Sequence, residues 1–306
     1  MNNHSSACQQ SILDAYQQHM CQVVGLAPKT CHDRGRNVSQ FLEAVELRRI
    51  TDLTKLTPPV FVSYLTARSG DYEPASLRKV ASSLRDFLRF AHQQGWTADA
   101  ALAEGVPKIA GGAHNDLPAY LSDAQLSALL KSWDRTRRNG VRDLAIGLCV
   151  ARLGLRAGEV AALRLEDLRW RQGTVRLPRS KNGGSADLPL LSEVGEALAD
   201  YLRTGRPVTP HRQVFVFGQP PRPLSPRGIG CVIARALRRC DIAVPHPGSH
   251  VLRHTLASHL VQKGATLKEV ADVLRHRDLN SAEVYAHVDV PHLRSLAQPW
   301  PVEATR

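Results

Sequence analysis

The stretch GTVRLPRSKNGGSADLPL, residues 173–190, is where the periodicity of the chain changes. Its ends, GTVRLP and ADLPL, are short extended runs, and the SKNGGS between them is rich in glycine, as in the tip of a β-hairpin. The segments before and after it have the apolar spacing of helices. This stretch therefore predicts a small antiparallel sheet inside a mostly helical domain.

Helical patterns lie on both sides of this hairpin. The segment LSDAQLSALLKSW begins with a capping box, in which Ser122 is the N-cap and Gln125 stands three residues later. Further helices are predicted over residues 141–152, after Gly154, and over residues 192–204, 226–239, 250–263, 267–275 and 280–287. This part of the chain is therefore expected to be an α+β domain with helices as its main element.

The first hundred residues have a different organisation, four helices without a strand. These helices are predicted over residues 8–25, 30–47, 58–68 and 74–94. The fourth carries one apolar stripe, formed by Leu77, Val80, Ala81, Leu84, Leu88 and Ala91. Basic residues on its other faces suit DNA phosphates, although most charged helix faces are simply solvated.

Composition shifts place the domain boundaries. We expect a helical bundle over residues 1–105 and a linker over residues 106–117, where prolines and paired glycines interrupt any period. A second domain is expected over residues 118–298, followed by a tail over residues 299–306. The fold class is therefore mainly α: an N-terminal four-helix bundle plus an α+β domain with a small antiparallel sheet.

Composition also limits the function. With 306 residues and 43% apolar content, the chain is large enough for about two domains with cores of their own. Its 40 Lys and Arg against 28 Asp and Glu give a formal charge of +12, which favours polyanionic partners, with nucleic acid first. No uncharged apolar run approaches the ~20 residues of a membrane helix, and the N-terminus has no secretory pattern. Six cysteines without a CxxC motif indicate free thiols, so we expect a cytoplasmic protein with no membrane contact.

Arginine dominates the basic residues. Eight of the 40 are lysines, which leaves 32 arginines, and Lys181 is the only lysine between Lys131 and Lys263. The planar guanidinium binds phosphate with two hydrogen bonds and keeps its proton, so this bias suits a phosphodiester backbone. A genome rich in G and C is the alternative explanation. RNA binding is disfavoured because aromatic residues, on which bases stack, make up only 5% of the chain.

The last third of the chain concentrates histidine and arginine. His250 and Arg253 are three residues apart, so on a helix they share a face near a helix start, where backbone N–H groups favour an anion. The alternative is an ordinary amphipathic helix. A metal site must also be considered, because His250 and His254 stand four residues apart, with His246 and His259 nearby in the sequence. However, no carboxylate base stands between His250 and His254, and Arg253 would repel a cation. We therefore expect no metal.

Four strings resemble the successive boxes of the tyrosine recombinase, or phage integrase, family. They are GLRAGEVAALRLEDL, SKNGGSADLPL, HVLRHTLASHLVQKGATLKEVADVLRH and SAEVYAHV, in the order and at the spacing of that family. The likeness covers roughly residues 118–290, and a weaker one links the N-terminal bundle to the family's SAM-like core-binding domain. By this resemblance the catalytic positions are Arg156, Lys181, His250, Arg253, His276 and Tyr285. Glu159 matches a supporting acidic residue, and Arg275 departs from the family, which often has glycine there.

The resemblance also implies a chemistry. Tyr285 would attack the phosphorus of a DNA strand and form a 3′-phosphotyrosyl bond, with no metal, ATP or other cofactor. Arg156 and Arg253 would stabilise the charge that grows on the phosphate, and His276 would add a hydrogen bond. His250 is the expected proton acceptor. Lys181 is the expected general acid, because lysine releases a proton near neutral pH far more readily than arginine.

The resemblance further implies partners. These are double-stranded DNA with recombination sites, a homotetramer on synapsed DNA, and accessory recombinase subunits. The segment over residues 288–306, with Leu293, Leu296 and Trp300, can pack on its own domain or on a neighbouring protomer, and the neighbour is favoured because the family commonly exchanges this segment. The expected role is DNA integration, excision or transposition by a recombinase of a bacterial mobile element. The alternatives are relaxation of DNA by a type IB topoisomerase mechanism, and a catalytically silent DNA-binding accessory factor.

Overall fold

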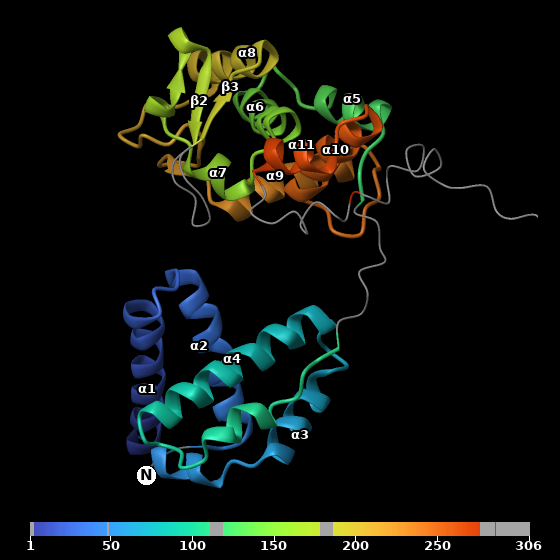
Figure 1. The fold of residues 1–306 in the computed structure, drawn as a ribbon. Helices are drawn as coiled ribbons and strands as arrows, with labels where there is room; N and C mark the ends of the chain where they lie inside the picture. Colours follow the sequence, from blue (N-terminus) through green and yellow to red (C-terminus); the bar gives the residue numbers. More distant parts are fainter. Residues whose placement is uncertain (1–2, 48, 111–118, 178–185, 276–284, 286–306) are drawn as a thin grey trace, which may run out of the picture. The chain divides into compact units, whose positions relative to one another are not determined.

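The computed structural model describes residues 3–47, 49–110, 119–177, 186–275 and Tyr285 (Figure 1). The chain forms two compact units, residues 1–115 and 116–306. As expected, the fold is mostly helical with a small antiparallel sheet. In the described part of the chain, no helix has the length and apolar character needed to cross a membrane.

The first unit contains the four expected helices. They are α1 (Asn3–Gln18), α2 (Pro28–Ala44), α3 (Pro58–Arg68) and α4 (Pro74–Gln93), with a π-helical turn over His19–Val23 and 3₁₀ turns over Ile50–Lys55 and Ala100–Gly105. The last three helices begin with proline, whose fixed φ suits a first helical position and whose missing N–H would be unpaired there in any case. The proline positions therefore explain where these helices start.

The apolar stripe of α4 faces the core of this unit, as the spacing predicted. All six of its residues are buried, against aromatic side chains that include Tyr16, Phe41 and Phe61. Two basic residues of α4 serve the fold: Arg85 donates to the carbonyls of Val106 and Pro107, and Arg89 pairs with Glu104 at 3.0 Å. Only part of the basic surface of α4 is therefore available to a ligand.

The second unit combines seven α-helices with short strands within its described residues. The helices are α5 (Asp123–Lys131), α6 (Arg138–Leu153), α7 (Ala157–Ala162), α8 (Ser192–Asp200), α9 (Pro226–Arg239), α10 (Ser249–Gln262) and α11 (Leu267–Leu274). Short turns lie at Leu165–Asp167, Trp170–Gln172 and Tyr201–Gly205. The predicted capping box starts α5, because Ser122 Oγ accepts from the N–H of Gln125 at 3.2 Å and the Gln125 side chain accepts from the N–H of Ser122.

The predicted hairpin is formed by β2 (Thr174–Leu177) and β3 (Ala186–Pro189), which pair antiparallel with Val175 opposite Leu188. A third strand, β1 (Leu168–Arg169), extends the sheet in the order β1-β2-β3, and β4 (Val216–Phe217) pairs with β5 (Arg222–Pro223). The hairpin tip with Lys181 lies outside the described residues. So do His276, the helix expected over 280–287 apart from Tyr285, and the tail.

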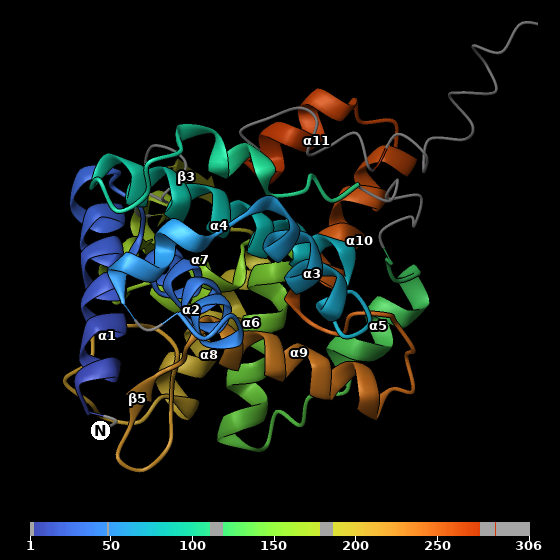
Figure 2. The same cartoon turned by 90° about the horizontal axis from the view of Figure 1, so that it is seen from below.

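The core of the second unit surrounds α6, most of whose residues are buried. Helix α10 packs against α6, α9 and α11, and α10 and α11 lie side by side in both views (Figure 1 and Figure 2). Two of these helices end in the left-handed region: α6 at Gly154, with φ +59°, and α11 at Arg275, with φ +55°. This arrangement brings the carboxyl ends of α6 and α11 to the side of α10.

Candidate active site

The carboxyl ends of α6 and α11 meet at the side chain of Arg253. This guanidinium, on α10, donates through Nη1 to the carbonyl of Gly154 and through Nη2 to the carbonyl of Leu274. Carbonyls at a helix C-terminus lack partners within the helix and carry the negative end of its dipole. They therefore provide a favourable place to bury an arginine that is only 5% exposed.

Arg156 lies beside this junction, at the residue before α7. Its backbone N–H and its Nη1 both donate to the carboxylate of Glu159, at 2.8 and 3.0 Å. Its Nη2 donates to the backbone carbonyl of Arg275 at 3.0 Å. Among the described residues these bonds occupy two of the five guanidinium N–H groups, and 38% of the side chain is exposed. Arg156 can therefore bind an anion from solvent while its direction is fixed.

Arg275 supplies a third guanidinium. The departure from glycine leaves the turn intact, because Arg275 adopts the left-handed conformation that glycine favours at helix ends. Its Nη2 donates to Glu159 Oε2 at 3.0 Å and to the Gly154 carbonyl at 3.2 Å. Its Nη1 donates to the carbonyls of Val273 and Leu153 at 3.1 and 3.4 Å. The side chain therefore turns back into the helix junction.

The electrostatics of this cluster favour an anion. Three guanidinium groups surround one carboxylate, which leaves a net charge of +2. Burial, with the charges of Arg156 and Arg275, lowers the pKa of Arg253 to about 10. Burial alone raises the pKa of Glu159, but the Arg156 N–H and the charges of Arg275 and Arg156 outweigh it, so this pKa lies below its usual value. At neutral pH all four groups are charged, and a phosphodiester would partly neutralise the excess.

Tyr285 is buried next to this cluster, in a small apolar core between α10 and α11. Its ring packs with Ala257, Val261 and Leu274, and its hydroxyl oxygen lies 2.6 Å from Nδ1 of His254. Burial raises the pKa of Tyr285 to about 12, although the charge of Arg253 opposes this shift. The phenol is therefore protonated at neutral pH.

His254 is the hydrogen-bond partner of this phenol. Burial, with the charges of His250 and Arg253, lowers the pKa of His254 to about 4. The ring is therefore neutral at pH 7, and Nδ1 accepts the hydrogen bond that the Tyr285 hydroxyl donates. His250 lies one turn earlier on α10 with an exposed side chain, and its ring centroid is 6.3 Å from that of His254.

The structure gathers four of the six expected residues in one region. Arg156, Arg253 and Tyr285 surround the junction of α6, α10 and α11, and His250 stands on the same helix as Arg253. The other two, Lys181 and His276, lie outside the described residues. Two further residues belong to the site. His254, considered above only as a metal ligand, shares a helix face with His250 four residues away, and the Arg275 side chain replaces the common glycine.

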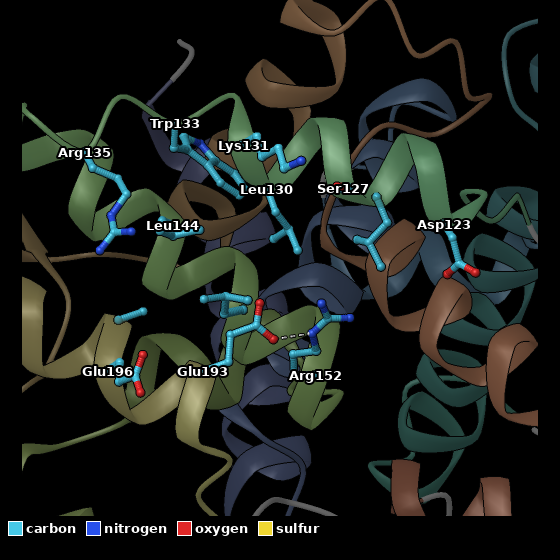
Figure 3. A pocket seen from close by; sticks show the side chains of 13 residues that line it. Asp123, Ser127, Leu130, Lys131, Trp133, Arg135, Leu144, Arg152, Glu193 and Glu196 are labelled. Carbon is cyan, nitrogen blue, oxygen red and sulfur yellow. Dashed lines mark hydrogen bonds and ion pairs between the residues drawn. The ribbon is translucent and has the colours of Figure 1, made fainter.

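Other features of the second unit are separate from this region. In the described ranges, no three His, Cys, Asp or Glu side chains stand close enough to hold a metal ion. A groove of about 470 Å³ lies between α5, α6 and α8, with Leu130, Trp133 and Leu144 on its wall and a bond of 2.8 Å between Arg152 and Glu193 (Figure 3). None of its lining residues belongs to the arginine cluster or contacts Tyr285.

Comparison with other proteins gives consistent matches. Residues 119–292 match the profile of the phage integrase family, and residues 13–95 match that of the phage integrase N-terminal SAM-like domain. A Sinorhizobium fredii protein named as an integrase/recombinase, y4rA, is 35% identical over 305 residues, which cover 99% of this chain and 74% of that protein. Tyrosine recombinase XerC of Oceanobacillus iheyensis is 29% identical over 262 residues, 84% of this chain and 83% of that protein.

Solved structures share the fold. The XerH site-specific recombinase in a post-cleavage complex with its palindromic difH substrate has a TM-score of 0.69 and 19% identity, over 95% of this chain and 83% of that chain. A lambda integrase tetramer bound to a Holliday junction has a TM-score of 0.70 and 18% identity, over 96% of this chain and 79% of that chain.

Proposed function

The chain belongs to the phage integrase family, and we propose that it breaks and rejoins DNA strands at specific sites through a 3′-phosphotyrosyl intermediate. The observation that supports this reaction best is the convergence of Arg156, Arg253 and Tyr285, from three distant segments, around one positively charged junction. A phosphodiester, which carries one negative charge, is the substrate class that such a junction fits.

Cleavage transfers a phosphoryl group to the enzyme. The Tyr285 hydroxyl oxygen forms a bond to phosphorus, the bond from phosphorus to the 5′ oxygen breaks, and the phenolic proton passes to a base. Negative charge grows on the non-bridging oxygens during attack, and the arginine cluster with its net charge of +2 stabilises that state more than the ground state. Rejoining is the reverse reaction, with a 5′ hydroxyl as nucleophile, so neither ATP nor a metal is required.

The phenolic proton has a partner in place. His254 accepts the hydrogen bond of Tyr285, and exposed His250 is the next ring on the helix. Burial raises the pKa of Tyr285 and lowers that of His254, so the proton stays on the phenol in this arrangement. We propose that binding of the phosphodiester changes the surroundings of Tyr285 before attack and that His250, which is exposed, accepts the proton.

Two further roles complete the reaction. We assign Lys181 as the general acid that protonates the departing 5′ oxygen, because its ammonium can release a proton near neutral pH. We assign His276 as a hydrogen-bond donor to a non-bridging oxygen. In the sequence it directly follows Arg275, whose carbonyl accepts from Arg156.

The N-terminal unit is the proposed second DNA-binding element. A groove of about 460 Å³ between α2 and α4 is lined by Arg34, Arg36 and Lys79, and Asp33 also lines it. Arg34 is paired with Asp86, whereas Arg36 and Lys79 are exposed. We therefore assign Arg36 and Lys79 to backbone phosphates, which position a protein on DNA without reading its sequence.

Recombination requires more than one protomer. Exchange of strands between two duplexes needs two cleavages on each, and we propose a homotetramer on double-stranded DNA with recombination sites, in the cytoplasm, with accessory recombinase subunits as further partners. The role in integration, excision or transposition for a mobile element follows from the same proposal.

The test uses a supercoiled plasmid that carries the gene with its flanking DNA. The chain is incubated with the plasmid in EDTA, and covalent protein–DNA complexes are trapped with detergent. We expect an adduct from the unmodified chain and none from Tyr285→Phe. Tyr120→Phe is the matched control, because Tyr120 is 38% exposed and its hydroxyl contacts only the Gln262 side chain among the described residues.

Each possible result of this experiment supports a different one of the three candidate functions. Tight plasmid binding without an adduct supports a silent accessory factor and overturns the proposal. Adduct formation and relaxation that persist at dilutions that prevent synapsis, without any recombinant product at higher concentration, support a topoisomerase. A covalent adduct together with recombinant plasmids supports site-specific recombination.

A further inference from the structure

We propose that Arg275 is a positioning residue for both catalytic arginines, and that it holds Arg156 and Arg253 at the separation that one phosphate requires. This inference rests on the proposed function. Within the described part of the chain, the side chain of Arg275 makes no hydrogen bond to Tyr285, so beyond the charge that it adds to the cluster it acts through Glu159, Gly154 and its own backbone carbonyl.

The backbone of Arg275 is the first link. Its carbonyl accepts from Arg156 Nη2 at 3.0 Å, and the carbonyl before it, of Leu274, accepts from Arg253 Nη2. Two successive carbonyls of one turn therefore hold the two arginines. The left-handed conformation at residue 275, with φ +55°, ends the helix at this point and sets the direction of both carbonyls.

The side chain of Arg275 is the second link. Its Nη2 lies between Glu159 Oε2, at 3.0 Å, and the carbonyl of Gly154, at 3.2 Å. Glu159 in turn accepts from Arg156, and the same Gly154 carbonyl accepts from Arg253. The Arg275 guanidinium therefore shares one acceptor with each catalytic arginine and connects the ends of α6 and α11 with the start of α7.

An arginine at residue 275 is energetically unfavourable for two reasons, which indicates that its side chain has a role. Left-handed backbone disfavours side chains that have a Cβ, and glycine would form the same turn without that cost. The guanidinium side chain is only 16% exposed, and it adds a positive charge beside Arg156 and Arg253. A residue needed only to end α11 would not require this charge.

The effect of losing this side chain follows from the contacts. Without it, Glu159 keeps Arg156 as a partner but loses the bond that fixes its other side, and the Gly154 carbonyl retains Arg253 alone. Arg156 and Arg253 then sample a wider range of separations. Small displacements of groups that stabilise a transition state reduce its formation far more than they weaken ground-state binding.

The experiment compares Arg275→Gly with the unmodified chain on one probe, the supercoiled plasmid with the flanking DNA of the gene. The rate of adduct formation is measured at saturating protein and in a single turnover, and plasmid affinity is measured separately by filter binding. We expect the cleavage rate to fall by about tenfold or more with affinity within about threefold. Glycine accepts the positive φ, so the turn itself is retained.

Asp241→Gly is the matched control. Asp241 also has a positive φ, +52°, shortly after a helix of the same unit, and it makes no contact with the arginine cluster. This variant should gain the same relief of backbone strain and keep the unmodified cleavage rate. Circular dichroism and thermal unfolding of both variants report whether the unit is folded.

A double-variant cycle with Glu159→Gln distinguishes positioning from a general structural role. If Arg275 acts through Glu159, the loss in the double variant is clearly smaller than the product of the two single losses. Millimolar guanidinium chloride should restore part of the cleavage rate of Arg275→Gly and should not raise the rate of the unmodified chain. Sodium chloride at the same ionic strength is the control for the effect of salt.

The outcomes keep the two proposals separate. No adduct from the unmodified chain overturns the proposed function. An adduct from the unmodified chain together with an unchanged rate in a folded Arg275→Gly variant overturns the positioning role and leaves the function standing. Multiplicative losses in the double variant also overturn it, since Arg275 would then act independently of Glu159.

Discussion

The hydroxyl oxygen of Tyr285 lies 2.6 Å from Nδ1 of His254, inside the apolar core that α10 and α11 form. A neutral imidazole accepts from a protonated phenol at this contact, and both groups are buried enough to resist ionisation. The Tyr285 phenol therefore stays protonated against α10, the helix that also carries Arg253. Helix α10 therefore carries both the histidine that binds the phenol and an arginine of the candidate site.

The pH dependence of stability should report on His254. In the unfolded chain this residue takes up a proton near pH 6.5, whereas in the folded chain its pKa is about 4. Between these values the unfolded state binds more protons, so stability is complete above pH 6.5 and declines as the pH falls toward 4. The Tm of His254→Gln, which does not titrate, should fall less across that range in calorimetric scans. Parallel curves for the two proteins would contradict the burial of His254.

Gly154 should tolerate no side chain. A Cβ at this position would meet Leu274 Cδ2 at 2.9 Å and Leu256 Cδ2 at 3.0 Å, in a residue whose φ is +59°. Gly154→Ala should therefore lower the free energy of unfolding by about 2–3 kcal/mol in urea titrations, with loss of adduct formation. Gly173→Ala is the control, because its φ of +62° is similar and a Cβ there would meet no atom of the described residues within 4 Å. We expect Gly173→Ala to lower the free energy of unfolding by only about 1 kcal/mol. Equal losses of stability in the two variants would exclude crowding as the cause at Gly154.

Arg253→Lys should lose stability and form the covalent adduct more slowly, although it keeps the positive charge. One ammonium replaces a fork that binds the carbonyls of Gly154 and Leu274; the Gly154 carbonyl keeps Arg275 as a donor, but a buried charge-assisted hydrogen bond is lost at a cost of about 1–3 kcal/mol. The rate of adduct formation should fall by about a hundredfold. Arg152→Lys is the control, since Arg152 makes a partly exposed pair with Glu193 and should change neither quantity measurably (Figure 3). A fully active Arg253→Lys variant would show that charge alone suffices.

The salt dependence of DNA binding should identify phosphate contacts in the first unit. Arg36→Gln and Lys79→Gln should each reduce the slope of log affinity against log salt concentration by about 1, as measured by fluorescence anisotropy on a duplex from the flanking DNA. Lys55→Gln, in the same unit but paired with Asp52 at 2.9 Å, should leave the slope unchanged. Unaltered slopes for Arg36→Gln and Lys79→Gln would exclude the groove between α2 and α4 as a DNA-binding surface.

Local patterns explain how much of the fold was predictable. The hairpin follows from a period of two on each side of a glycine-rich tip, and α5 follows from the capping box at Ser122. The apolar stripe of α4 is buried as its spacing requires. Strands β1, β4 and β5 could not be predicted, because two residues are too few to show any period and their pairing is set by the surrounding core.

The sequence predicts which residues belong to the candidate site, but it does not predict which of them contact one another. Sequence order places Arg156, Arg253 and Tyr285 in matching boxes, but nothing local indicates that two helix ends meet at Arg253. The bond between His254 and Tyr285 joins residues 31 apart, and the contact of Arg275 with Glu159 joins residues 116 apart. Such partners depend on tertiary packing, which one sequence does not display.

The junction of α6 and α11 has a consequence for how the protein is made. Its anchoring groups come from the middle of the chain and from residues 274 and 275, so a growing polypeptide that stops before residue 274 carries Arg156 and Arg253 without two of the carbonyls that bind them. A broken or prematurely terminated product lacks the same anchors. The arrangement that the two arginines need therefore forms only after residues 274 and 275 have joined the chain.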